Sequence, residues 1–147
     1  MNERPFAGVA AIVGTLAAVE TRLEEALEPL GLSLAKFKAL HTLVTAGEAL
    51  PLRTLAAECA CVRSNITQLV DRLEAEKLVV RANDPSDRRS IRAELTAEGR
   101  NRYKAGSRAL QAAETEMLSP LTKAEREALF ELLSALRAQA GVPEATR

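Results

Sequence analysis

Residues 55–100 read LAAECACVRSNITQLVDRLEAEKLVVRANDPSDRRSIRAELTAEGR and contain the change of periodicity that decides the fold. In the first half, apolar side chains recur at i, i+3, i+4 and i+7, which predicts a helix over residues 63–77. The positions that share its buried face are Ile66, Leu69, Val70 and Leu73. The period then changes to that of strands. Residues 78–80 and 91–95 read as two short strands, and the turn formers between them predict a hairpin with a long polar tip.

Shorter helical patterns precede this stretch. Residues 52–59 have apolar side chains at helical spacing and are separated from the helix over 63–77 by only three residues. A further helix is predicted between the cap Ser33 and Gly47. Its expected inner face is Phe37, Leu40, His41 and Val44. Two short helices joined by a three-residue turn and followed by a β-hairpin describe a winged helix-turn-helix, which predicts a DNA-binding lobe over residues 33–95.

Both ends of the chain carry long amphipathic patterns. Apolar residues recur at steps of three and four between positions 6 and 27, and two more helices are expected after the cap Thr96, separated at Pro120. Thr122 and Glu125 have the spacing of a capping box. One small domain cannot bury all these stripes, so residues 1–30 and 97–147 are expected to be dimerisation helices. The predicted fold is mainly α, a winged helix-turn-helix with flanking N- and C-terminal dimerisation helices in a single subunit, residues 1–147.

The charge of the chain is zero in sum but uneven along the sequence. Twenty basic and 20 acidic residues cancel over 147 residues, yet residues 81–108 hold eight basic and four acidic ones. Binding of nucleic acid through a globally basic surface is therefore excluded, and any DNA-binding surface must be local. Aromatic residues make up 3% with no Trp, which argues against a stacking platform for single strands. The N-terminus MNERPFAG is not typical of a signal peptide and no apolar run is long enough to span a membrane, so we expect a cytoplasmic protein.

The face of the 63–77 helix opposite its apolar residues suits the major groove. We expect Gln68 to pair with adenine and Arg72 with guanine or a phosphate, and Arg63 with the helix N-terminus to hold a phosphate. Asp71 is better placed to orient an arginine than to meet DNA. In the hairpin tip, Arg88 and Arg89 are the candidates for the minor groove. The candidate DNA-binding residues are Arg63, Ser64, Asn65, Thr67, Gln68, Arg72, Arg88 and Arg89.

These residues resemble those of the multiple antibiotic resistance regulator (MarR) family. Its wing signature, Asp, any residue, Arg, five residues and then Leu-Thr, is present as Asp87, Arg89, Leu95 and Thr96, after the stretch LVDRLEAEKLV. The resemblance implies a homodimer that represses transcription from a palindromic operator, with the Asp87 position fixing the wing. It also implies release by thiol oxidation or by a small-molecule effector, which would bind in a cleft beside the dimer helices. Candidate lining residues of that cleft are Phe37, His41 and Tyr103.

Other functions remain open at this point. Cys59 and Cys61 replace residues that would normally pack in the core, and a thiol-based redox-sensing regulator using them is one alternative. A winged-helix module for protein interaction without DNA binding is another, although it would not need Arg88 and Arg89. An enzyme is not expected, because the chain has one His, no Gly-rich phosphate loop and no Gly-x-Ser-x-Gly motif. No cofactor is expected, and Cys59, Cys61 and His41 lack the spacing of a metal site.

Overall fold

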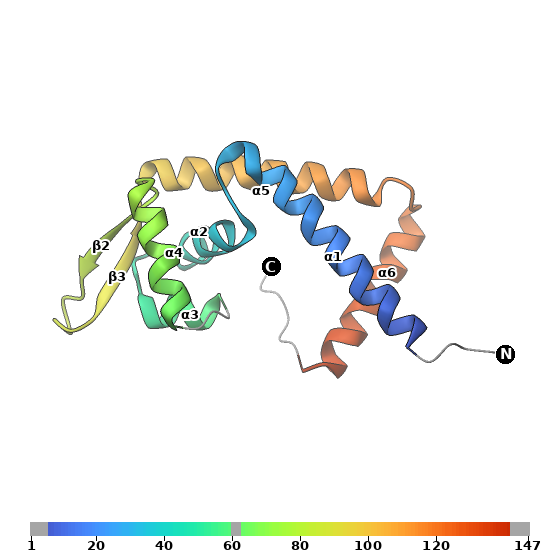
Figure 1. The fold of residues 1–147 in the computed structure, drawn as a ribbon, viewed down its shortest axis with the longest axis horizontal. Coiled ribbons are helices and arrows are strands. Elements are labelled where there is room, and N and C mark those ends of the chain that lie inside the picture. The colour runs from blue at the N-terminus through green and yellow to red at the C-terminus, as the bar shows by residue number, and fades with distance from the viewer. Residues whose placement is uncertain (1–5, 60–62, 142–147) are drawn as a thin grey trace. The chain divides into compact units, whose positions relative to one another are not determined.

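Helices make up most of the structure, and a small antiparallel sheet completes it (Figure 1), as the sequence predicts. The computed structural model describes residues 6–59 and 63–141. Its contacts divide the chain into two units, Met1–Gln111 and Ala112–Arg147. The elements in chain order are α1 (Ala7–Leu27), a 3-10 turn η1 (Glu28–Leu30), α2 (Leu34–Ala46), β1 (Leu50–Pro51), α3 (Leu52–Glu58), α4 (Arg63–Ala75), β2 (Val79–Asn83), β3 (Ile91–Leu95), α5 (Ala97–Leu118) and α6 (Lys123–Gln139).

The hydrophobic core lies in the first unit, where α2, α3, α4 and the sheet meet. Ile66, Val70 and Leu73 of α4 are fully buried and Leu69 is partly buried, which confirms the predicted inner face of this helix. The largest fully buried side chains are Leu27, Leu40, Leu43, Leu55, Ile66, Val70, Leu73, Leu78 and Val79. Within the described residues, none of the helices combines the length and the apolar character needed to cross a bilayer.

The predicted inner face of α2 is only partly right. Leu40 is fully buried, but the buried stripe continues through Ala39 and Leu43, while the His41 side chain is exposed. The helix packs against α3, α4 and β3. These three elements cover the side of α2 that carries Ala39, Leu40 and Leu43, which differs from the predicted side. His41 therefore lies at the edge of the contact, where its ring stays in reach of solvent.

The sheet has three strands in the order β1-β3-β2. β2 and β3 pair antiparallel, with Val79 opposite Leu95 and Asn83 opposite Ile91, so this hairpin is the predicted wing. β1 pairs with the other edge of β3 through Leu50 opposite Ala93 and was not predicted. A two-residue strand that contains a proline has no alternation for a sequence pattern to reveal.

The predicted helix caps are confirmed. Ser33, Thr96 and Thr122 each accept a hydrogen bond from the backbone amide three residues later, at 3.2, 2.9 and 3.3 Å. Thr122 and Glu125 form the full capping box at the start of α6. Gly47 ends α2 with φ of 71°, a left-handed conformation that glycine adopts without a steric cost.

Leu78 connects α4, the wing and α5. Its amide donates to the Leu73 carbonyl at 2.9 Å and so ends α4. Its carbonyl accepts from the amide of Thr96 at 3.1 Å and from the Thr96 hydroxyl at 3.0 Å. Gly99 in the first turn of α5 lies against the same carbonyl, and a Cβ atom at this position would be only 2.1 Å from the Leu78 oxygen.

Gly99→Ala should therefore destabilise the fold. The added methyl group meets backbone, which cannot rotate away, so the free energy of unfolding should fall by about 2–3 kcal/mol despite the better helix propensity of alanine. Urea unfolding followed by circular dichroism at a fixed protein concentration measures this change.

Gly8→Ala is the matched control, because Gly8 also lies in the first turn of a helix and a Cβ atom added there would have nothing within 4 Å. We expect its unfolding free energy to equal or slightly exceed that of the native chain. Equal stabilities for the two alanine variants would contradict the close approach at Leu78.

Candidate nucleic-acid interface

One face of α4 is polar and exposed to solvent. Asn65, Thr67, Gln68 and Arg72 are all exposed, opposite the buried face of the same helix. The structure thus brings four of the six candidate residues of this helix to one surface. The side chains of Arg63 and Ser64, which were also predicted to bind DNA, lie outside the described part of the chain.

Arg81 of β2 binds two carboxylates of α4. Its Nη1 lies 2.8 Å from Oε2 of Glu74, its Nη2 pairs with Asp71, and its backbone amide donates to Glu74 at 3.1 Å. The hydrogen bond to Asp71 is the main reason why the pKa of Arg81 lies above its usual value. Asp71 thus orients an arginine, as its sequence position suggested. The place of Arg81 in the basic stretch would suit a phosphate contact, but its guanidinium is bound to carboxylates instead.

Asp84 organises the tip of the wing. The sequence pattern identified it only as one of the turn formers between the two strands. Its Oδ1 accepts from the hydroxyl and the amide of Ser86 at 2.7 and 2.9 Å, and its Oδ2 accepts from Arg92 Nε at 3.0 Å. Arg92 also donates to the Ala49 carbonyl at 3.4 Å, which links the tip to the residue before β1.

The hydrogen bonds from Ser86 and then Arg92 lower the pKa of Asp84 to about 2. A lowered pKa means that the charged form is the one stabilised by the fold. The contribution to stability is therefore complete above the ordinary carboxyl pKa of about 4 and is lost as the pH falls toward 2.

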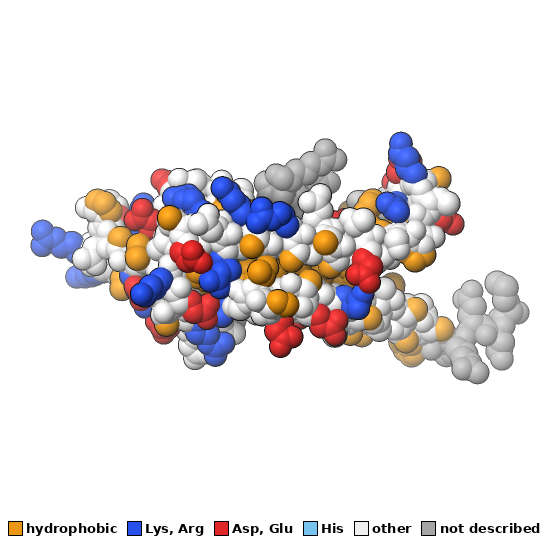
Figure 2. Space-filling model, turned by 90° about the horizontal axis from the view of Figure 1, so that it is seen from above, with side chains coloured by type: hydrophobic (Ala, Val, Ile, Leu, Met, Phe, Trp, Pro, Cys, Tyr) orange, Lys and Arg blue, Asp and Glu red, His pale blue; other side chains and the backbone are white. Residues whose placement is uncertain are grey.

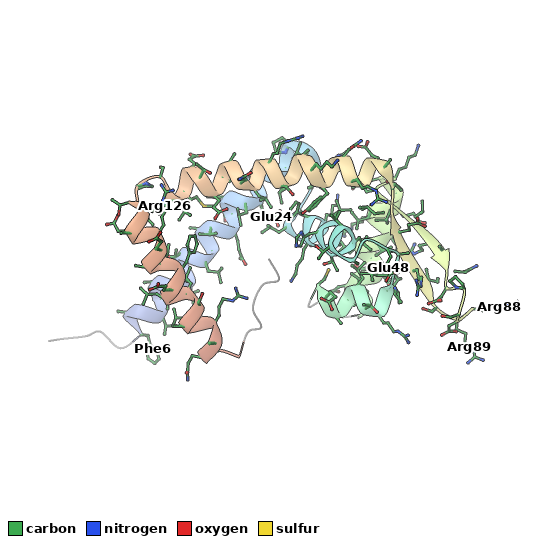
Figure 3. All side chains as sticks on the ribbon, turned by 180° about the vertical axis from the view of Figure 1, so that it is seen from behind. Phe6, Glu24, Glu48, Arg88, Arg89 and Arg126 are labelled. Atoms are coloured by element: carbon green, nitrogen blue, oxygen red, sulfur yellow. The ribbon has the colours of Figure 1, made fainter. Side chains whose placement is uncertain are left out.

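Asp87, Arg88 and Arg89 form the end of the wing. The carboxylate of Asp87 accepts from the backbone amide of Arg89 at 3.0 Å, which fixes the local turn. The side chains of Arg88 and Arg89 are exposed and point away from the hairpin (Figure 3). In the space-filling view, basic side chains project from the wing end of the first unit (Figure 2). The tip thus presents two guanidinium groups on a short, internally hydrogen-bonded turn.

The three candidate effector residues lie together. The rings of Phe37 and Tyr103 stack at 5.3 Å between centroids, and His41 Nδ1 lies 3.0 Å from the Tyr103 hydroxyl. Phe37 and Leu32 also lie against Gly106 of α5. The cluster therefore packs α2 against α5.

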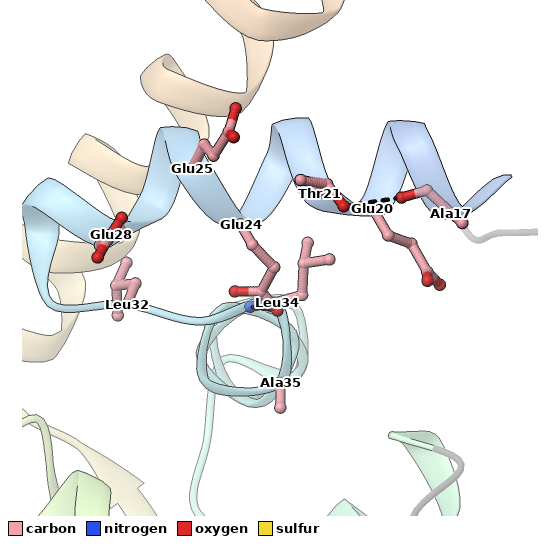
Figure 4. A pocket seen from close by; sticks show the side chains of 9 residues that line it. All are labelled: Ala17, Glu20, Thr21, Glu24, Glu25, Glu28, Leu32, Leu34 and Ala35. Atoms are coloured by element: carbon pink, nitrogen blue, oxygen red, sulfur yellow. Dashed lines mark hydrogen bonds between the residues drawn. The ribbon is translucent and has the colours of Figure 1, made fainter. Parts of the chain in front are cut away.

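A groove lies between α1 and the start of α2 (Figure 4). It has a volume of about 890 Å³, and the Glu24 carboxylate at its wall accepts from the amide of Leu34 at 3.1 Å. None of the three predicted effector residues lines it; Leu32 adjoins both the groove and the aromatic cluster. The lining residues are Ala17, Glu20, Thr21, Glu24, Glu25, Glu28, Leu32, Leu34 and Ala35. Periodicity did not indicate this groove, because it depends on how two helices pass each other.

Cys59 is buried in the core, with its sulfur 3.7 Å from the Thr42 hydroxyl. Cys61 lies outside the described residues. Over residues 6–59 and 63–141, no group of three or more His, Cys, Asp or Glu side chains is arranged to hold a metal ion.

Comparison with known proteins gives a consistent family. The MarR family model matches residues 30–90. The chain is 36% identical over 73 residues to the uncharacterized HTH-type transcriptional regulator YkoM of Bacillus subtilis. The matched region covers 50% of this chain and 46% of YkoM. It is 30% identical over 103 residues to the uncharacterized HTH-type transcriptional regulator YsmB of the same organism, with coverages of 67% and 70%.

Solved structures share the fold over nearly the whole chain. A MarR-family transcriptional regulator from Silicibacter pomeroyi is 29% identical, with a TM-score of 0.68 and coverages of 95% and 93%. CouR from Rhodococcus jostii, solved with p-coumaroyl-CoA, is 25% identical, with a TM-score of 0.77 over 99% and 100% of the chains. A MarR mutant from E. coli complexed with operator DNA shares the fold at 24% identity, with a TM-score of 0.76 and coverages of 91% and 99%. Together with the wing and the exposed face of α4, these matches establish that the chain belongs to the MarR family of transcriptional regulators.

Proposed function

We propose that this regulator is a repressor that binds a palindromic operator as a homodimer and leaves it when a small-molecule effector binds. The observation that carries the proposal is the pairing of an exposed polar face on α4 with a wing that ends in Arg88 and Arg89. Such a pair of elements matches the two grooves of duplex DNA. This function would locate the protein where the chromosome is, in the cytoplasm.

In the proposed complex, α4 lies in the major groove. Gln68 then pairs with adenine and Arg72 with guanine or a phosphate, while Asn65 and Thr67 contact the edges of the groove. Arg63 and the backbone amides at the start of the helix then hold a phosphate, and Ser64 belongs to the groove-facing side with Gln68. The wing reaches the minor groove through Arg88 and Arg89, and Asp87 positions them through the backbone amide of Arg89.

Exposed apolar side chains on α1 and α6 support the proposed homodimer. On each helix they recur with helical spacing, and about half or more of each side chain is open to solvent. Large apolar surfaces of this kind mark interfaces in soluble proteins, and a second copy of the chain offers the same surface in return. The residues are Val9, Ile12, Val13 and Leu16 on α1 and Phe130, Leu132, Leu133 and Leu136 on α6.

The groove beside α1 supports the proposed effector. Its volume of about 890 Å³ suits a small organic molecule. CouR, which shares the fold and is 25% identical, was solved with p-coumaroyl-CoA bound. Phe37, His41 and Tyr103 do not line this groove, and we propose them as an adjacent part of the effector site because Phe37 and the groove residue Leu32 both lie against Gly106. Thiol oxidation is the less favoured signal, because Cys59 is buried and an oxidant has little access to its sulfur.

The double substitution of Arg88 and Arg89 by alanine should weaken DNA binding without unfolding the protein. We expect an affinity loss of about 10–100-fold for a duplex from the region upstream of the protein's own gene, because the wing contacts are lost. The dependence of log affinity on log salt should become shallower by about two, one for each lost charge. Fluorescence anisotropy over a salt series measures both.

Alanine at Arg100 and Arg108 is the control, because both are exposed basic residues on α5 in the same charge-rich stretch. This variant removes the same charge and should keep most of the affinity. An equal loss in the two double variants would indicate attraction by overall charge and would contradict the wing assignment. Absence of binding by the native protein to any genomic fragment would contradict the proposed function itself.

Replacing Leu133 and Leu136 by glutamate should dissociate the proposed dimer. Two charges in an apolar interface are not desolvated without a large cost, so the mass in solution should fall toward that of one chain. Light scattering after size exclusion at micromolar concentration measures it. Ser134→Glu, which adds a charge at an exposed position of the same helix, should leave the dimer intact. A native protein that is monomeric under these conditions would contradict the dimer.

A further inference from the structure

We propose that Arg81 is a positioning residue of the DNA-binding surface, which binds both Asp71 and Glu74 of the recognition helix α4 and offsets one of their two negative charges, so that they repel DNA less. The inference rests on the DNA binding proposed above. It adds a residue outside the predicted contact set, and it gives a role to the two acidic side chains that the recognition helix carries next to its polar face.

The geometry fixes the guanidinium firmly. Arg81 lies in the middle of β2, opposite Ala93 of β3, so the hairpin sets the position of its backbone. Glu74 binds that backbone amide at 3.1 Å and Nη1 at 2.8 Å. Nη2 binds Asp71 and lies 3.4 Å from the Thr67 carbonyl. Both ends of the guanidinium are therefore bound within the protein, and Arg81 is not placed to act as a phosphate contact.

The two carboxylates lie where an unpaired charge would matter. Asp71 is three residues after Gln68 and next to Arg72, so on the helix surface it adjoins the side chains proposed to read bases. Its side chain is 56% exposed and that of Glu74 is 39% exposed, whereas that of Arg81 is 24% exposed. Without Arg81, both carboxylates would face a polyanion across a short distance.

The net charge of Arg81, Asp71 and Glu74 distinguishes this role from a purely mechanical link between α4 and the wing. Removal of the Arg81 charge changes the net charge of the cluster from −1 to −2, and the added repulsion is screened by salt. Neutral amides at all three positions abolish the repulsion even though every ion pair of the cluster is lost. A mechanical link between α4 and the wing would instead stay broken in that variant, and its loss would not depend on salt.

The test compares Arg81→Gln, Arg81→Lys and the triple variant R81Q/D71N/E74Q on the same upstream duplex. We expect R81Q to bind at least about tenfold more weakly at low salt, with the deficit narrowing as salt rises. The triple variant carries no charge at these three positions and should bind at least as tightly as the native protein. R81K keeps the charge and should bind within a few-fold of the native protein, which provides a reading if R81Q is poorly folded.

Arg22→Gln is the matched control, because Arg22 also pairs with a carboxylate, Glu25, but on α1. It should bind as the native protein does, and circular dichroism at the assay temperature checks that each variant is folded. Native affinity of R81Q would overturn the inference, and so would a triple variant as weak as R81Q. Failure of the proposed function is distinguishable, because the native protein would then not bind the duplex at all.

Discussion

The backbone carbonyl of Leu78 is the point on which the arrangement of the DNA-binding lobe depends. It accepts two hydrogen bonds from Thr96, and Gly99 packs against it so closely that no side chain fits between. The amide of the same residue ends α4. The end of α4, the start of the wing and the start of α5 are thus held together by the backbone of one residue. Fixing these three elements together sets the distance between the polar face of α4 and the wing.

Much of this fold was predictable because its determinants are local. The caps at Ser33, Thr96 and Thr122 and the buried stripe of α4 follow from residue type and spacing, and the structure confirms them. β1 was missed because its pairing with β3 is a tertiary contact without a local pattern. His41 was misplaced for a related reason: periodicity predicts that a helix is amphipathic, but its neighbours decide which sector is buried.

The candidate site likewise has features that the sequence predicts and features that depend on tertiary contacts. The exposed positions of α4 follow from helical geometry once the buried face is known, and the exposure of Arg88 and Arg89 follows from a polar tip. The partners of Asp84 and Arg81 were not predictable. Each pairs across the hairpin or between helix and strand, so the choice depends on strand register and on the distance between elements. The residue type alone does not indicate whether a charged side chain forms an ion pair within the folded protein.

The pairing of charges explains how a chain with no net charge presents a basic surface. Arg92 binds Asp84, and Arg81 binds the two carboxylates of α4, so two of these three negative charges are offset where they lie. The same arginines are engaged within the protein and only partly exposed, while Arg88 and Arg89 remain exposed at the tip. The field that DNA meets is then set by a few unbalanced groups and not by the total charge. Because such a field decays within about 10 Å at moderate salt, it favours binding only of a duplex whose grooves fit the helix and the wing.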